Sequence, residues 1–164
     1  MPLAVSGYEL SLFLHITAVV VGLGATFAES ILFPIALKLG TRHLPYVHRL
    51  QLAINQRFAT PALVIVLITG IYQTLTGPWS FADFWISASF AIVIVLGALI
   101  GAYFIPADRR LAPMAERELA AGEGADPELS DEYQRQARRE GIAGAIAGIL
   151  IVAAIFLMVV KPGA

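Results

Sequence analysis

The sequence predicts an all-α integral membrane four-helix bundle, and three observations lead to this fold class. Apolar residues make up 58% of the 164 positions, whereas charged residues make up only 14%. Soluble domains are about 45–50% apolar and about 25% charged. The apolar residues form long stretches, and ten of the eleven Lys and Arg residues fall in only two of the segments between them. The chain is therefore expected to be a single transmembrane domain, residues 1–164.

Four apolar stretches are long enough to span a bilayer, at about 10–37, 59–76, 82–105 and 141–160. A helix of about 20 residues, rising about 1.5 Å per residue, crosses a hydrocarbon core about 30 Å thick. The first stretch is not expected to be a cleaved signal peptide. No Lys or Arg precedes it, and its apolar run exceeds the usual length of about 7–15 residues.

The basic residues predict how the four spans are oriented. Four of them lie between the first and second spans and six between the third and fourth, whereas only Lys161 follows the fourth span. Positively charged loops stay on the cytoplasmic side of a membrane. Both connections are therefore expected in the cytoplasm, with the N-terminus and the C-terminus outside (N-out/C-out).

Residues 45–58 are expected to form a short basic amphipathic helix on the cytoplasmic leaflet, which turns into the second span near Pro61. Apolar residues repeat along it at helical spacing, namely Val47, Leu50, Ile54 and Phe58. His48 and Asn55 fall outside this stripe. The helix is expected to be an anchor on anionic lipid, and binding of a partner protein is the alternative.

Residues 107–140 form the longest polar segment and are predicted to be a solvated cytoplasmic connection. Asp126 is expected to cap a helix that has Pro127 at its first position. This helix is expected to continue into the fourth span without a break. The segment contains no phosphate-binding loop, nucleophile elbow or paired metal-ligand spacing. No catalytic residue is therefore predicted in it.

Small residues spaced four apart occur in three of the spans: Ala18 and Gly22, Gly97 and Gly101, and Gly144 and Gly148. Such pairs let two helix backbones approach closely in lipid. They are expected to mark contacts within the bundle, and the alternative is a homodimer face.

His15 and Glu29 are two ionisable residues within the first span. Residues of this kind are costly in a membrane and normally mark function. Fourteen residues separate them, or about 21 Å along a helix, so they are expected to belong to two separate sites. His15 is a candidate cofactor and metal ligand, as the axial ligand of a b-type haem. The alternative is a neutral imidazole that hydrogen-bonds to a neighbouring helix, through Ser11, Thr17 or Ser89.

Glu29 is a membrane-embedded acid near the cytoplasmic end of the first span. One interpretation is a carboxylic acid that burial keeps neutral, or that pairs with a base such as Arg57. The other is a carboxylate that binds a proton or a cation.

Several kinds of site are excluded by composition. The chain contains no cysteine, which excludes disulfides, Fe–S clusters, c-type haem and thiolate metal sites. Its three methionines are scattered and form no copper-binding patch. The net charge of −1 gives no reason to expect a nucleic-acid partner.

Two stretches carry a family likeness: "LHITAVVVGLGATF" in the first span and "ITGIYQTLTG" at the end of the second. They resemble an uncharacterised family of small bacterial four-helix predicted integral membrane proteins. This family is distantly similar to the copper-resistance D membrane domain and to HemJ-type protoporphyrinogen oxidases. The resemblance implies a location in the bacterial inner membrane, and the functional position that it carries over is His15. HemJ-type enzymes also use a lysine in the third helix, and this chain has none in any expected span.

Two functions are compatible with these features. The first is a membrane protein that binds b-type haem at His15 or is otherwise linked to redox chemistry. The second is a non-enzymatic accessory or small-solute-binding subunit of a larger membrane complex. The lipid bilayer is the expected partner in both, together with a second copy of the chain or a larger complex, and an enzymatic activity is left open.

Overall fold

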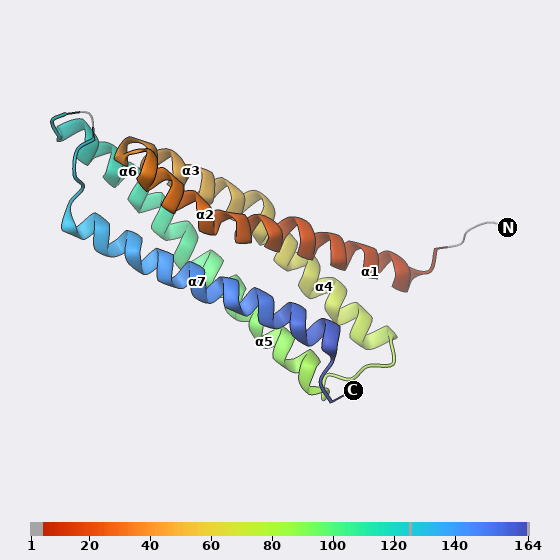
Figure 1. Ribbon diagram of the computed structural model, residues 1–164. Helices are drawn as coiled ribbons and strands as arrows, with labels where there is room; N and C mark the ends of the chain where they lie inside the picture. Colours follow the sequence, from red (N-terminus) through yellow and green to blue (C-terminus); the bar gives the residue numbers. More distant parts are fainter. Residues whose placement is uncertain (1–4, 125, 164) are drawn as a thin grey trace.

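The computed structural model describes residues 5–124 and 126–163, in which the chain forms four long helices (Figure 1). Their bounds are Gly7–Leu39, Thr41–Thr76, Phe84–Ala121 and Asp131–Val160. Each helix is long and apolar enough to cross a membrane. The all-α fold with four apolar helices is therefore confirmed, and the chain is a multi-pass membrane protein. The N-out/C-out orientation stays a prediction.

The first long helix consists of α1 (Gly7–Ala18), a π-helical turn (Val19–Leu23) and α2 (Gly24–Leu39). Ser6 and Glu9 cap its start. The Ser6 hydroxyl accepts a hydrogen bond from the Glu9 N–H at 3.2 Å, and the Glu9 carboxylate accepts one from the Ser6 N–H at 2.8 Å. This reciprocal pair satisfies backbone donors at the helix end. Gly40 follows the helix with a φ of 112°, a conformation that favours glycine.

The second long helix follows a 3₁₀ turn (Thr41–His43) and consists of α3 (Leu44–Ile54), a π-helical turn (Asn55–Ala59) and α4 (Thr60–Thr76). The prediction of a surface helix at 45–58 that turns into the second span is wrong. Helix α3 is continuous with α4, and it packs along α6 (Ile105–Ala121). Leu44 is buried in this contact. The buried face of this helix also carries His48 and Asn55, which the sequence pattern placed outside the apolar stripe.

The third long helix consists of α5 (Phe84–Ala98), a π-helical turn (Leu99–Phe104) and α6. It extends about four turns past the predicted end of the span at residue 105. The fourth is α7 (Asp131–Val160), which enters the bundle without a break, as predicted. Ser130 caps α7, since its hydroxyl accepts a hydrogen bond from the Tyr133 N–H at 3.2 Å. The predicted helix cap at Asp126 is therefore wrong. Residues 107–140, which were expected to be a solvated connection, include the end of α6 and the start of α7, and both pack in the bundle.

Two large apolar clusters hold the helices together, beside a smaller one of Ala18, Ala62 and Val66. The first consists of Leu23, Ala59, Leu63, Leu96, Ile100, Phe104, Ala147 and Ile151. The second consists of Ala36, Leu44, Val47, Leu111, Ala115, Leu129, Tyr133 and Ala137. Many large apolar side chains on the outer faces of the helices stay exposed, which is the surface that a lipid environment requires.

The small-residue pairs differ in their surroundings. Gly22 is a true contact point, because a Cβ placed there would lie 1.9 Å from the Cβ of Ala62 on α4. A Cβ at Gly97, Gly101 or Gly144 would meet no neighbouring helix within 4 Å in the described parts of the chain. The predicted contact between helices is thus confirmed for Ala18 and Gly22. It is wrong for Gly97, Gly101 and Gly144.

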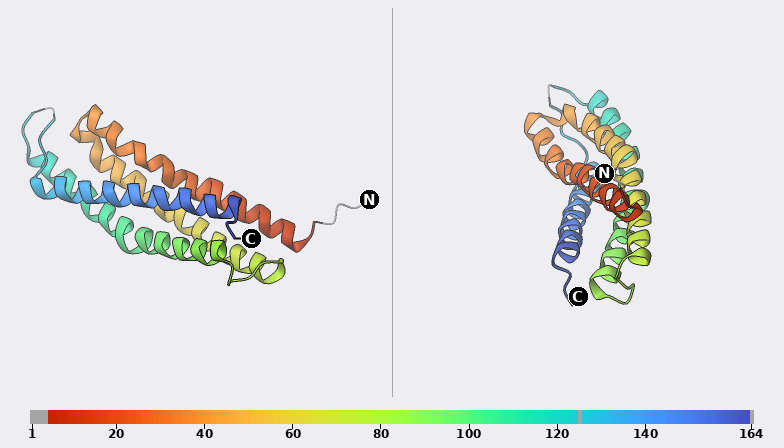
Figure 2. Two further views of the ribbon diagram at one scale, coloured as in Figure 1. Left: turned by 60° about the horizontal axis from the view of Figure 1, so that its bottom comes forward. Right: turned by 90° about the vertical axis from the view of Figure 1, so that its right-hand side faces the viewer.

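Helix α1 begins and α7 ends at one end of the bundle, and the two basic connections lie at the other (Figures 1 and 2). At the first end, the Lys161 ammonium lies 4.2 Å from the ring centroid of Trp79, a favourable cation–π distance. At the other end, the hydroxyl of Thr41 donates to the carboxylate of Asp126 at 2.6 Å. Arg42 also donates to the carbonyl of Gly124 at 2.8 Å, so the two connections are tied together.

Candidate functional site: a buried histidine–carboxylate cluster

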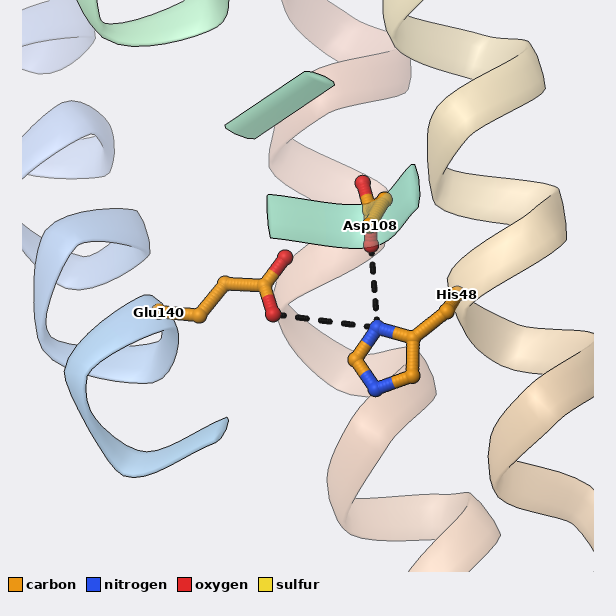
Figure 3. A group of neighbouring side chains, drawn as sticks. All are labelled: His48, Asp108 and Glu140. Carbon is orange, nitrogen blue, oxygen red and sulfur yellow. Dashed lines mark hydrogen bonds and ion pairs between the residues drawn. The ribbon is translucent and has the colours of Figure 1, made fainter. Parts of the chain in front are cut away.

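Three ionisable side chains from three helices meet inside the bundle: His48 on α3, Asp108 on α6 and Glu140 on α7 (Figure 3). The Nδ1 atom of His48 lies 2.9 Å from Oδ1 of Asp108 and 3.7 Å from Oε2 of Glu140. His48 and Asp108 are 0% exposed, and Glu140 is 8% exposed. We refer to these three residues as the buried cluster.

Helical periodicity brings each member of the buried cluster to the bundle interior. On α3, His48 follows Leu44 by one turn, and both residues are buried. On α7, Glu140 lies on the same face as the buried residues Tyr133 and Ala137, at intervals of four and three residues. Asp108 lies on α6 between the two apolar clusters. The apolar packing of both clusters therefore holds the three side chains together.

Tyr133 contacts the far side of the imidazole. Its hydroxyl lies 2.9 Å from Nε2 of His48, and the two rings meet edge to face with centroids 5.9 Å apart. A tyrosine hydroxyl either donates or accepts. When it accepts from the Nε2–H, the lone pair of Nδ1 points toward the two carboxyl groups. This arrangement has the form of a metal-binding histidine oriented by an outer partner.

With both carboxyl groups ionised, the buried cluster has more hydrogen-bond acceptors than donors. Oδ2 of Asp108 is buried and finds no hydrogen-bond partner among the described residues. Two carboxyl groups share one imidazole in apolar surroundings, and an uncompensated buried charge is costly. A bound cation would supply the missing positive charge.

A second polar group lies next to the buried cluster, on α2 and the following helix. Glu29, 8% exposed, accepts a hydrogen bond from the side-chain amide of Asn55 at 3.4 Å. Within the described residues, Oε1 of Glu29 and Oδ1 of Asn55 are buried without a partner. Arg57, the base that the sequence suggested for Glu29, is exposed. Glu29 therefore pairs with an amide.

A cavity of about 880 Å³ opens beside both polar groups, between α2 and α7. Glu29, Asn55 and Glu140 contribute to its polar end. The rest of its lining is mostly apolar and follows α7 as far as Phe156. Its volume lies within the range of about 300–1,000 Å³ that is typical of sites for small molecules.

His15 lies in a different part of the bundle. Its Nδ1 atom is 2.8 Å from the hydroxyl of Thr69 on α4, so a hydrogen bond to a neighbouring helix is present, with a partner other than those suggested by the sequence. The cavity that His15 lines measures about 20 Å³, far less than a haem requires. His15 lines this small cavity and Glu29 the large one, in agreement with two separate sites.

The buried cluster was missed because all three members lie outside the long apolar stretches. One signal could have revealed it. Leu44, Val47, His48, Gln51 and Asn55 form an alternative helical stripe, and Tyr133, Ala137 and Glu140 form another. Both stripes mix apolar with ionisable residues, and this mixture made the exposed interpretation more attractive.

Comparison with curated proteins and with solved structures found no significant match. A family of predicted integral membrane proteins, DUF2269, matches residues 9–162. The matched range includes the buried cluster, Glu29 and the residues that line the large cavity. No match tests the likeness to the copper-resistance D domain or to the HemJ-type oxidases. The match covers nearly the whole length of the four helices, and the chain therefore belongs to the DUF2269 family of predicted integral membrane proteins.

Proposed function

We propose that this membrane protein binds a divalent transition-metal ion at the buried cluster. One observation carries the proposal: a histidine nitrogen and two carboxylate oxygens, from three different helices, all lie within 4.8 Å of one another. In tetrahedral geometry a zinc-type ion about 2.0–2.2 Å from each ligand holds its ligand atoms about 3.3–3.6 Å apart. Side-chain movements of up to about 1 Å would bring the three atoms to this spacing.

The ligand set favours particular ions. Imidazole with carboxylates suits Zn²⁺, Fe²⁺ and Mn²⁺, whereas Cu⁺ prefers the sulfur ligands that this cluster lacks. Three protein ligands leave at least one coordination position open, which is the pattern of metal sites that act on a substrate. The cavity beside Glu140 gives that position an approach route.

Metal titration of purified protein tests the proposal. After removal of metal with a chelator, the protein in neutral detergent is titrated with Co²⁺, whose visible spectrum reports the ligand geometry, and then with Zn²⁺. We expect one ion per chain and a higher melting temperature in the presence of the ion. His48→Ala and Asp108→Asn should lose this binding, because each removes a ligand.

His43→Ala is the matched control, since His43 is exposed five residues before His48. It should bind Co²⁺ like the wild type. Circular dichroism establishes that each variant is folded, and Asp108→Asn keeps the shape of the side chain if His48→Ala does not fold. Wild-type protein that binds no ion, or equal binding by Asp108→Asn, contradicts the proposal.

The b-type haem at His15 stays a separate prediction. Binding of haem there requires the helices around the small cavity to move apart. An absorption spectrum of protein expressed with haem tests the prediction, because a Soret band that His15→Ala removes would support it.

A further inference from the structure

We propose that the large cavity between α2 and α7 binds an amphiphile with a protonated amine head and an apolar chain. The head would lie against Glu29 and Asn55, and the chain would follow α7. This inference goes beyond the proposed metal site and does not depend on it. Glu140 borders both sites, but the head group would contact Glu29 and Asn55, which are not part of the buried cluster.

The polar end of the cavity selects the head group. Glu29 and Asn55 are 8% and 2% exposed, and both line the cavity. Their free atoms, Oε1 of Glu29 and Oδ1 of Asn55, are acceptors that lack donors in the described structure. A protonated amine supplies donors without bringing a further acceptor.

Charge favours the same head group. Two carboxyl groups, from Glu29 and Glu140, line this end of the cavity. The ion pairs found among the described residues leave Glu29 without a basic partner. A ligand cation would be paired with a buried carboxylate, and such charge-assisted hydrogen bonds are about twice as strong as neutral ones.

The shape of the cavity selects an extended apolar chain. Its lining reaches from Glu140 to Phe156, sixteen residues apart on α7 and about 24 Å along a helix. Small residues on α7 keep this space open, and these are Gly141, Gly144, Ala145 and Gly148. The small pair in the fourth span thus makes room for a ligand.

The cavity opens toward the lipid-facing surface of the bundle. Phe27 on α2 and Ile149, Val152 and Phe156 on α7 all line it, and all four are more than half exposed. An amphiphile dissolved in the bilayer would therefore enter sideways between α2 and α7. Its chain would stay in apolar surroundings throughout.

Binding of dodecylamine tests the proposal. Titration calorimetry of the purified wild-type protein in neutral detergent compares dodecylamine with dodecanol, which has the same chain and an uncharged head. We expect saturable binding of one amine per chain. The amine should bind about tenfold or more tightly than the alcohol, as expected for one charge-assisted hydrogen bond.

Two variants test the two ends of the cavity independently. Glu29→Gln should reduce amine binding to the level of the alcohol, since it removes the charge and keeps the size. Gly144→Leu should weaken binding of both ligands, because the new side chain fills the path of the chain. Gly97→Leu is the control, since Gly97 also meets open space but is not among the residues that line the cavity.

The outcomes separate this proposal from the metal site. Glu29→Gln should still bind Co²⁺, and Asp108→Asn should still bind dodecylamine. Equal affinity for dodecanol and dodecylamine, or unchanged amine binding by Glu29→Gln, overturns the assignment of the head group. Unchanged binding by Gly144→Leu overturns the assignment of the cavity, even if the metal site is real.

Discussion

The two ring nitrogens of His48 have different partners. The partner of one nitrogen therefore determines whether the other can bind an ion. Nδ1 faces the carboxyl groups, and Nε2 faces the hydroxyl of Tyr133. If Nδ1–H donates to Asp108, the Tyr133 hydroxyl would donate to Nε2. If Nδ1 held an ion, the ring proton would be on Nε2 and the Tyr133 hydroxyl would accept. The tyrosine hydroxyl serves both states because it has both roles.

Tyr133→Phe should weaken Co²⁺ binding about tenfold, because loss of an outer partner of a ligating histidine costs about 10–100-fold in affinity. Competition with a chromophoric chelator measures the affinity. Tyr46→Phe is the matched control, since Tyr46 lies on the same helix as His48 and is exposed. Equal affinities of Tyr133→Phe and wild type would show that the hydroxyl does not orient the imidazole.

Gly22→Ala should destabilise the bundle, because the new methyl group would overlap the side chain of Ala62 on α4. Overpacking of this kind costs about 1–3 kcal/mol. Gly24→Ala on the same helix should leave the melting temperature unchanged or raise it, since a Cβ there meets no neighbouring helix within the described structure. Thermal unfolding in one detergent compares the two variants. A melting temperature for Gly22→Ala at or above that of Gly24→Ala would refute the close contact.

At the scale of elements, the hydrogen bonds that join the two basic connections should depend on pH. Hydrogen bonds from Thr41 lower the pKa of the Asp126 carboxyl, and the charges of Arg42 and His43 contribute further. A carboxyl group whose pKa is lowered in the folded state stabilises that state above its unfolded pKa. The contribution is lost as pH falls through the folded pKa.

Asp126→Ala should therefore melt below the wild type at neutral pH, and the difference should shrink as the pH falls below about 3.9, the ordinary pKa of aspartate. Thermal unfolding at a series of pH values measures it. Glu123→Ala, an exposed acid in the same connection, should show no such trend. A difference for Asp126→Ala that is constant with pH would mean that the carboxylate charge plays no part in the tie.

Helix type and number were predictable from the sequence, but helix length was not. Uninterrupted apolar residues mark where a helix meets lipid, and this signal ends near residue 105 in the third helix. The helix continues to Ala121 because α3 and α7 cover its inner face, through Leu111 and Ala115 among others. Such cover depends on tertiary contacts between residues far apart in the chain. The periodicity of a single segment does not show these contacts. The buried cluster lies in the parts of the helices that extend beyond the apolar stretches.

His15 and Glu29 show the same limit for sites. Their position within an apolar span made both conspicuous, and both do pack against the second long helix. Asp108 is followed by two arginines, and Glu140 is preceded by two, so both appeared to belong to solvated segments. The meeting of three helices shows that these acids face inward, and the helical stripe that includes Glu140 was the one sign of it in the sequence.

At the scale of the whole molecule, both basic connections lie at the end of the bundle opposite the start of α1 and the end of α7 (Figure 1). The ten-to-one division of basic residues predicts that this end is cytoplasmic. Because the chain has no cysteine, single cysteines can report the orientation directly. Ser80→Cys should react with an impermeant thiol reagent in intact cells, and Glu123→Cys should react only after the membrane is opened. The reverse pattern would invert the topology.

The distribution of the buried cluster over three helices has a consequence for biogenesis. During synthesis, His48 is made before Asp108, and Asp108 before Glu140, and the first two lie 60 positions apart in the chain. An Asp108 carboxyl group can meet His48 once the third helix has been made, but Glu140 joins only after the last helix begins. Intermediates that lack α7 therefore leave the histidine–aspartate pair uncovered on the side where α7 packs. A released chain that ends before residue 131 would remain in this state, so addition of α7 closes this polar interior.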